Sequence, residues 1–165
     1  MKILVLSDSH AAMGFMRRCI SVLKPDAVIH LGDYFDDAQA LQEELSHLPF
    51  HMVAGNCDRY RCPPSAREML CYPVGGVLMM MTHGHNYHVK TGLGALLAEA
   101  RRLSALAVLF GHTHAEVCFQ EEDGLWVINP GTSGYGSKTA AVVETDGEKI
   151  TACRIVTQAD VEEWK

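Results

Sequence analysis

The stretch Lys2-Ile3-Leu4-Val5-Leu6-Ser7-Asp8-Ser9-His10 joins an uninterrupted aliphatic run to a polar end. A strand that is apolar at every position is buried on both faces, as the central strands of parallel sheets are. Side chains just past the carboxyl ends of parallel strands meet along one edge of the sheet, where ligands bind. This segment therefore predicts an α/β fold with a polar site at the strand ends.

Apolar strands and amphipathic helices alternate through the first two-thirds of the chain. Apolar residues at helical spacing predict helices at 13–23, 38–48 and 93–103. Continuous apolar runs predict strands at 2–7, 27–31, 50–54, 77–82 and 105–110. The last third changes to strands joined by turns, at 125–128, 140–144 and 150–156. This order predicts one α/β domain over residues 1–165.

The composition of the chain excludes several classes of protein. The net charge of −6 argues against a broad basic face that binds nucleic acid. No stretch approaches the roughly 18 consecutive apolar residues of a membrane helix, so no membrane partner is expected. The 6 cysteines include no CxxC pair, and a chain of this size needs no disulfides to be stable. We therefore expect reduced thiols and a cytoplasmic location.

Five of the predicted strands run directly into small polar clusters. These are Asp8-Ser9-His10, Gly32-Asp33 with Asp36, Gly55-Asn56-Cys57-Asp58, Thr82-His83-Gly84-His85 and Gly111-His112-Thr113-His114. Carboxylate, imidazole and amide groups gathered at one edge supply the oxygen and nitrogen ligands of a metal site. The spaced pairs Asp8/His10 and His112/His114 are expected in extended backbone, where alternation points both side chains to one side. Each cluster alone is an ordinary turn, but their coincidence predicts a metal centre.

The order D-x-H, GD-x-x-D, GN-x-D, H-G and GH-x-H resembles the calcineurin-like metallophosphoesterase superfamily. The length and the GNCD variant are similar to the small single-domain bacterial and archaeal phosphodiesterases of that superfamily, and Asn129-Pro130-Gly131-Thr132 extends the resemblance. The resemblance implies a metallophosphoesterase fold, with a central β-sandwich flanked by helices in α/β/β/α layers. It also implies hydrolysis of a phosphodiester by in-line attack of a metal-bridging hydroxide.

The resemblance assigns roles to the polar residues one by one. It implies two divalent metal ions, with manganese as the first choice and nickel, zinc, iron and magnesium as alternatives. One ion is assigned to Asp8, His10 and His114, the other to Asn56, His83 and His112, and Asp33 bridges the two. Asp36 and Asp58 are assigned to orient these ligands by hydrogen bonds, without binding the metal themselves. Asn56 and His83 then take part in catalysis through the metal and not as nucleophiles.

The third motif departs from the superfamily, which mostly has GNH where this chain has Gly55-Asn56-Cys57. A histidine there is the usual candidate for protonating the leaving group. A thiol, with an ordinary pKa of about 8.5, can donate a proton but is a weaker candidate. We therefore expect a preference for diesters with good leaving groups and weak monoesterase activity. A weakly basic or apolar role of Cys57 and a nucleophilic role of its sulfur are the alternatives.

The identity of the substrate is less constrained than the metal site. His85 and Arg59 follow the motifs and are the candidate contacts to a small-molecule or nucleotide-like phosphodiester. A nuclease and a non-catalytic scaffold of the same fold are the alternatives; the first is disfavoured by the acidic charge and the second by the complete ligand set. Apolar residues around Met69–Tyr72 would favour a homo-oligomer if they are exposed.

Overall fold

The computed structural model describes residues 1–162 of the chain. Its strands are β1 (Lys2–Leu6), β2 (Ala27–His30), β3 (Phe50–Met52), β4 (Met69–Val74), β5 (Val77–Thr82), β6 (Ala107–Leu109), β7 (Val117–Gln120), β8 (Trp126–Asn129), β9 (Thr139–Thr145) and β10 (Ile150–Thr157). Its helices are α1 (Met13–Leu23), α2 (Phe35–Glu44), α3 (Gly94–Arg102), α4 (Gln158–Glu162) and the 3-10 turn η1 (His85–Tyr87). The last part of the predicted domain, 163–165, lies outside the described residues.

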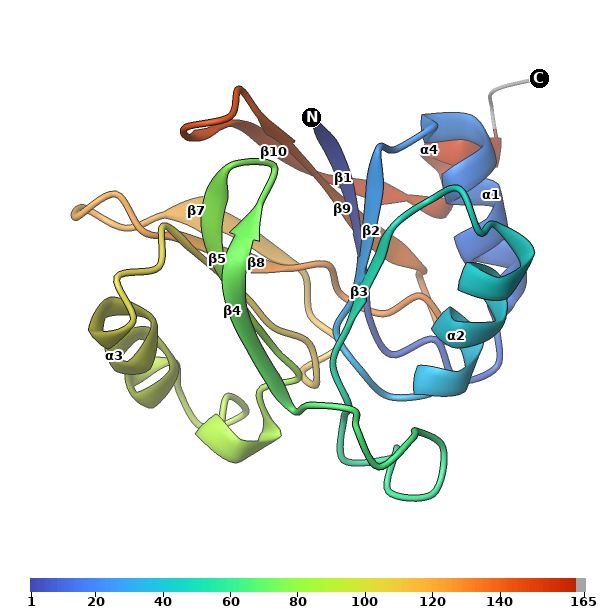
Figure 1. Cartoon of the computed structure of the whole chain (residues 1–165), viewed down its shortest axis with the longest axis horizontal. Helices are drawn as coiled ribbons and strands as arrows, with labels where there is room; N and C mark the ends of the chain where they lie inside the picture. The colour runs from blue at the N-terminus through green and yellow to red at the C-terminus, as the bar shows by residue number, and fades with distance from the viewer. Residues whose placement is uncertain (163–165) are drawn as a thin grey trace.

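Two mixed sheets pack face to face within the described residues, and helices cover both outer sides (Figure 1). Sheet A has the order β10-β9-β1-β2-β3, and sheet B has the order β4-β5-β6-β8-β7. Helices α1, α2 and α4 lie on the outer side of sheet A, and α3 lies on the outer side of sheet B (Figure 1). The predicted α/β/β/α layering is confirmed.

The packing of β1 explains why the chain is aliphatic there. β1 pairs in parallel with β2 and antiparallel with β9, so it is central in sheet A. Ile3 and Val5 face the core between the sheets, whereas Leu4 and Leu6 face the core under α1 and α2. Burying each such side chain contributes about 1.5 to 3 kcal/mol, so both faces of the strand select apolar residues.

The sequence pattern does not predict β4, β7 or α4. β4 pairs antiparallel with β5 at the edge of sheet B, where Pro73 is tolerated because an edge strand has one unpaired side. The segment Met69–Tyr72 is half-buried. Its side chains pack against the core between the two sheets and against the core between sheet B and α3. The apolar surface on which self-association was expected is therefore partly covered, and a homo-oligomer stays a prediction.

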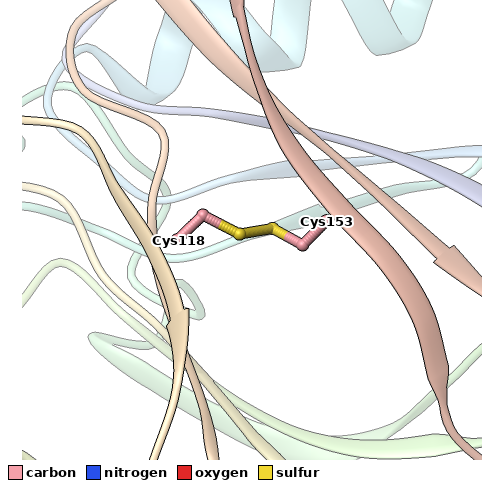
Figure 2. Close-up of a disulfide and its surroundings, with 2 residues drawn as sticks. All are labelled: Cys118 and Cys153. Carbon is pink, nitrogen blue, oxygen red and sulfur yellow. A yellow bond between two sulfur atoms is a disulfide. The ribbon is translucent and has the colours of Figure 1, made fainter.

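A disulfide joins Cys118 in β7 to Cys153 in β10 (Figure 2). These strands are the edges of the two sheets, and the fold brings the two Cα atoms to 6.5 Å, within the usual range for a disulfide. The expectation that all thiols are reduced is therefore wrong. The two cysteines are 35 residues apart, and no spacing motif marks a pair that only the packing of two sheets brings together.

The predicted cytoplasmic location depends on reduced thiols and stays a prediction. Cys19, Cys57, Cys62 and Cys71 are free. No helix between residues 1 and 162 combines the length and apolar character that crossing a membrane requires.

Candidate metal centre

The loops that follow β1, β2 and β3 gather at the lower end of the molecule in Figure 1, where β5 also ends. Five of the predicted ligand residues, including two in the loop after β6, have left-handed backbone: φ is 54° at Asp8, 46° at His10, 58° at Asp33, 67° at His112 and 58° at His114. The expectation of extended backbone at the two spaced pairs is therefore wrong. Left-handed backbone is costly for residues other than glycine and collects at functional sites, so surrounding contacts must hold these loops.

Two groups of ligand atoms form at this end of the sheets. One group is Asp8, His10 and His114, the other is Asp8, Asp33 and His83, and the ligand atoms in each lie within 4.8 Å of one another. His114 Nε2 lies 3.0 Å from Asp8 Oδ1, and His83 Nε2 lies 3.4 Å from Asp33 Oδ1. Asp8 belongs to both groups, whereas the resemblance assigns the bridging role to Asp33. That assignment stays a prediction.

Unsatisfied ligand atoms indicate that a cation fits here. Asp8 Oδ1, His10 Nε2 and His83 Nε2 are buried without a hydrogen-bond partner among the described residues. Leaving a buried polar group unpaired costs about 1 to 3 kcal/mol, so three such atoms in one place indicate a missing partner. His83 Nδ1 lies 2.8 Å from the carbonyl oxygen of Leu31; if it donates its proton there, the lone pair of Nε2 faces the carboxylates. The donor set suits a divalent ion.

The electrostatics of the site favour ionised carboxylates. Burial acts to raise the pKa of Asp33, but the neighbouring His83 and a hydrogen bond from the backbone N–H of Cys57 outweigh it and hold the pKa well below its usual range. Burial acts to lower the pKa of His83, but Asp33 and Asp8 outweigh it and raise the pKa. Burial and the nearby His83 lower the pKa of His112 to about 4, so its ring is neutral at pH 7, as a metal ligand must be.

Asp58 and Asp36, the two carboxylates expected behind the ligands, lie in different surroundings. Asp58 is buried and accepts hydrogen bonds from the backbone N–H groups of Gly55, Asp33 and Phe35 at 2.7, 2.9 and 2.8 Å. It therefore ties the second ligand loop to the third. Asp36 is exposed and pairs with Arg61 at 3.0 Å, and the structure does not bring it to the ligands.

Asp37 supports the first ligand loop, although no motif of the sequence marks it. Its buried carboxylate accepts from Ser9 Oγ at 2.7 Å and from the backbone N–H of Ala11 at 2.8 Å. Asp36 and Asp37 are neighbours in the first turn of α2, and consecutive helix positions point about 100° apart. Which of the two carboxylates faces the ligand loop therefore depends on the residue at which α2 begins, and the sequence does not show this residue.

The turn at Asn129–Thr132 connects two ligand loops. Asn129 Nδ2 donates to the carbonyl oxygen of Gly111 at 3.1 Å and to Thr113 Oγ1 at 3.0 Å. Thr132 Oγ1 donates to the carbonyl oxygen of Asp8 at 3.0 Å. This motif of the sequence therefore helps to hold the left-handed backbone around His112 and at Asp8.

Two glycines allow the ligand loops to approach closely. A Cβ atom at Gly55 would collide with the carboxylate and backbone of Asp33, and one at Gly111 would collide with the hydroxyl group of Ser7. Neither glycine has a positive φ, so the requirement at both positions is space and not backbone conformation.

The remaining predicted residues lie around the two groups. His112 has its ring 5.0 Å from that of His83 and lies outside the two ligand groups. Asn56, Arg59 and His85 line a cavity of about 850 Å³, and the His85 ring is 5.5 Å from the His83 ring.

Cys57 and two tyrosines lie on the exposed side of the centre. Burial and the neighbouring Asp33 raise the pKa of the Cys57 thiol to about 11, so it is protonated at pH 7. The rings of Tyr34 and Tyr135 lie 4.9 and 4.7 Å from the ring of His10. Tyr135 was not predicted, because the motif that it follows, Asn129–Thr132, carries none of the predicted metal ligands.

The chain is similar to known phosphoesterases. Residues 1–148 match the calcineurin-like phosphoesterase superfamily domain. A probable metallophosphoesterase of Mycoplasma pneumoniae is 31% identical over 137 residues, which cover 79% of this chain and 78% of that protein. A phosphodiesterase of Methanocaldococcus jannaschii is 28% identical over 170 residues, which cover 88% of this chain and 94% of that protein.

Solved structures share the fold. A predicted phosphoesterase of Streptococcus pneumoniae superposes with a TM-score of 0.70 at 24% identity, covering 95% of this chain and 97% of that one. The zinc complex of Vps29 from Entamoeba histolytica superposes with a TM-score of 0.74 at 19% identity, covering 95% and 99%. The region from Asp8 to His114 lies within the matched domain, and the chain belongs to the calcineurin-like phosphoesterase superfamily.

Proposed function

We propose that this chain is a metal-dependent phosphodiesterase with two divalent ions. The observation that carries the proposal is the pair of ligand groups that share the buried Asp8, in which three buried ligand atoms form no hydrogen bond within residues 1–162. The similarity to the phosphodiesterase of M. jannaschii supports a diester over a monoester as the substrate.

The residues divide between two ions. Asp8, His10 and His114 would hold one ion, Asn56, His83 and His112 would hold the other, and Asp33 would be shared by both, with manganese as the first choice. Ions bound there would acidify a water molecule for in-line attack on phosphorus and polarise the phosphoryl oxygens.

The chain itself supplies the preorganisation. Asp58 joins two ligand loops through three backbone hydrogen bonds, and Asp37 fixes the loop between Asp8 and Ala11. The carbonyl oxygen of Leu31 fixes the ring of His83. Ligands held this rigidly need little rearrangement when charge develops on the phosphoryl group.

Cys57 limits the range of leaving groups. A thiol with a pKa of about 11 is neutral at pH 7 and a weak proton donor. Leaving groups that depart without protonation, such as nitrophenolate, would therefore react best. The expected preference is for diesters with good leaving groups.

Bis(p-nitrophenyl) phosphate and p-nitrophenyl phosphate, assayed with Mn²⁺, Ni²⁺, Zn²⁺ and Mg²⁺, test the proposal. We expect faster hydrolysis of the diester, and loss of activity in Asp33→Asn. Full activity in that variant, or a faster reaction with the monoester, would contradict the proposal. Bound metal without turnover of either ester would favour a non-catalytic scaffold, and cleavage of plasmid DNA in preference to both esters would favour a nuclease.

A further inference from the structure

The cavity of about 850 Å³ adjoins the metal ligands and is lined by residues of the long connection between β3 and β4. Asn56 and His85 line it on the side nearest His83, and Arg59 and Arg67 also line it. The cavity therefore adjoins the ligand groups, because the ring of its lining residue His85 lies 5.5 Å from the ring of His83.

Neither Arg59 nor Arg67 forms an ion pair within residues 1–162. The guanidinium group of Arg59 lies 5.6 Å from the ring centroid of Tyr60, and Arg67 uses only its backbone carbonyl, which accepts from Ala54. Other arginines in this acidic protein do form ion pairs: Arg17–Glu44, Arg61–Asp36, Arg101–Asp123 and Arg102–Glu99. Two arginines without a carboxylate partner thus line the same cavity.

The two acidic residues that line the cavity, Asp58 and Glu68, already have partners. Asp58 accepts three backbone N–H groups. Glu68 accepts from Asn86 at 2.8 Å, and its other oxygen lies 3.9 Å from His85 Nε2. The formal charges of the lining cancel, but both carboxylates contact other residues of the protein, whereas the two guanidinium groups, with five N–H donors each, have no carboxylate partner within residues 1–162. An acceptor-rich anion suits this lining.

We infer that the cavity binds a second phosphate group, carried on one ester arm of the substrate, through Arg59 and Arg67. The inference rests on the proposed function: a diester held at the metal ligands has two arms, and one of them can pass Asn56 and His85 into the cavity. Guanidinium groups bind phosphate through paired, charge-assisted hydrogen bonds. The substrate class is therefore a phosphodiester with a further phosphate, and Arg59 and Arg67 determine the specificity for it.

Competitive inhibition of bis(p-nitrophenyl) phosphate hydrolysis tests this assignment on the manganese-loaded protein. The inhibitors are thymidine 5′-monophosphate and thymidine 3′,5′-bisphosphate, which differ by one phosphate, and calorimetry gives their affinities independently of turnover. We expect the bisphosphate to bind about 30-fold more tightly than the monophosphate. Arg59→Gln and Arg67→Gln should each reduce this ratio by about fivefold, and the double variant should bring it to about one.

Arg154→Gln is the matched control, because Arg154 is an exposed arginine in β10 that does not line the cavity. It should keep the wild-type ratio of affinities. An unchanged ratio in the double variant would overturn the cavity assignment while diester turnover continues to support the proposed function. Absence of diester turnover, with the arginine-dependent ratio retained in calorimetry, would instead overturn the proposed function.

Discussion

Replacing Asp58 tests whether the ligand loops are held by one buried carboxylate. Its Oδ2 accepts the N–H groups of Gly55 and Asp33 at 2.7 and 2.9 Å, and its Oδ1 accepts that of Phe35 at 2.8 Å. Hydrogen bonds to a charged group contribute about 1.5 to 3 kcal/mol each, so three give an upper limit of about 4.5 to 9 kcal/mol. Water entering the space and relaxation of the loops reduce the expected loss in Asp58→Ala to about 3 to 5 kcal/mol.

Urea unfolding in the presence of a chelator measures this loss without a contribution from bound metal. The corresponding fall in Tm is about 6 to 20 °C, since a chain of this size loses about 2 to 4 °C per kcal/mol. Asp58→Asn should fall between the wild type and Asp58→Ala, because the amide oxygen can accept two of the three N–H groups while its NH₂ opposes the third.

Asp36→Ala is the control, since this carboxylate is exposed and pairs only with Arg61. A surface ion pair contributes about 0 to 1 kcal/mol, so the control should remain close to the wild type. The reasoning is refuted if Asp58→Ala and Asp36→Ala have the same free energy of unfolding.

Three further predictions concern other parts of the chain. Cys57→His should increase kcat/KM for diesters with poor leaving groups by at least about tenfold, since an imidazole is a better proton donor near pH 7; unchanged kinetics would count against the role given to Cys57. Burial lowers the pKa of His30 from 6.5 to about 4, so the neutral ring stabilises the fold above pH 6.5. About 3 kcal/mol should be lost as the pH falls from 6.5 to 4, and His30→Asn, unfolded in parallel, should show a flatter pH profile. Reduction of the Cys118–Cys153 disulfide, which spans 35 residues, should lower the free energy of unfolding by up to about 4 kcal/mol, and Cys118→Ser should abolish that response to reductant. Thiol titration of the denatured, unreduced chain that finds 6 thiols, where the disulfide leaves 4, would contradict the last prediction.

The sequence predicted the elements that are buried on both faces better than those at the edges. β1 is apolar at nearly every position because both of its faces lie in cores, and such a run predicts a buried strand from the sequence alone. β4 and β7 are edge strands with half-exposed, mixed side chains, so their composition gives no clear period. Their existence follows from partners that lie elsewhere in the chain.

The identity of the ligand cluster was predictable because parallel strands bring their carboxyl ends to one edge. The sequence alone could not show that Asp8 and His10 have left-handed backbone, because hydrogen bonds from distant loops hold it there. It marked Asp36 rather than Asp37, since the choice depends on the phase of α2. The disulfide escaped prediction for a similar reason, because it depends on how the two sheets pack against each other.

We expect the ligand groups around Asp8 and Asp33 to bind two divalent ions, and metal binding at these groups can be located experimentally. Anomalous diffraction at the manganese edge, from crystals grown with Mn²⁺, tests it most directly. We predict two peaks about 3.5 to 4 Å apart, as in other two-metal sites. One peak should lie beside Asp8, His10 and His114, and the other beside Asp33, Asn56, His83 and His112. A single peak, or manganese bound only outside these groups, would contradict the account.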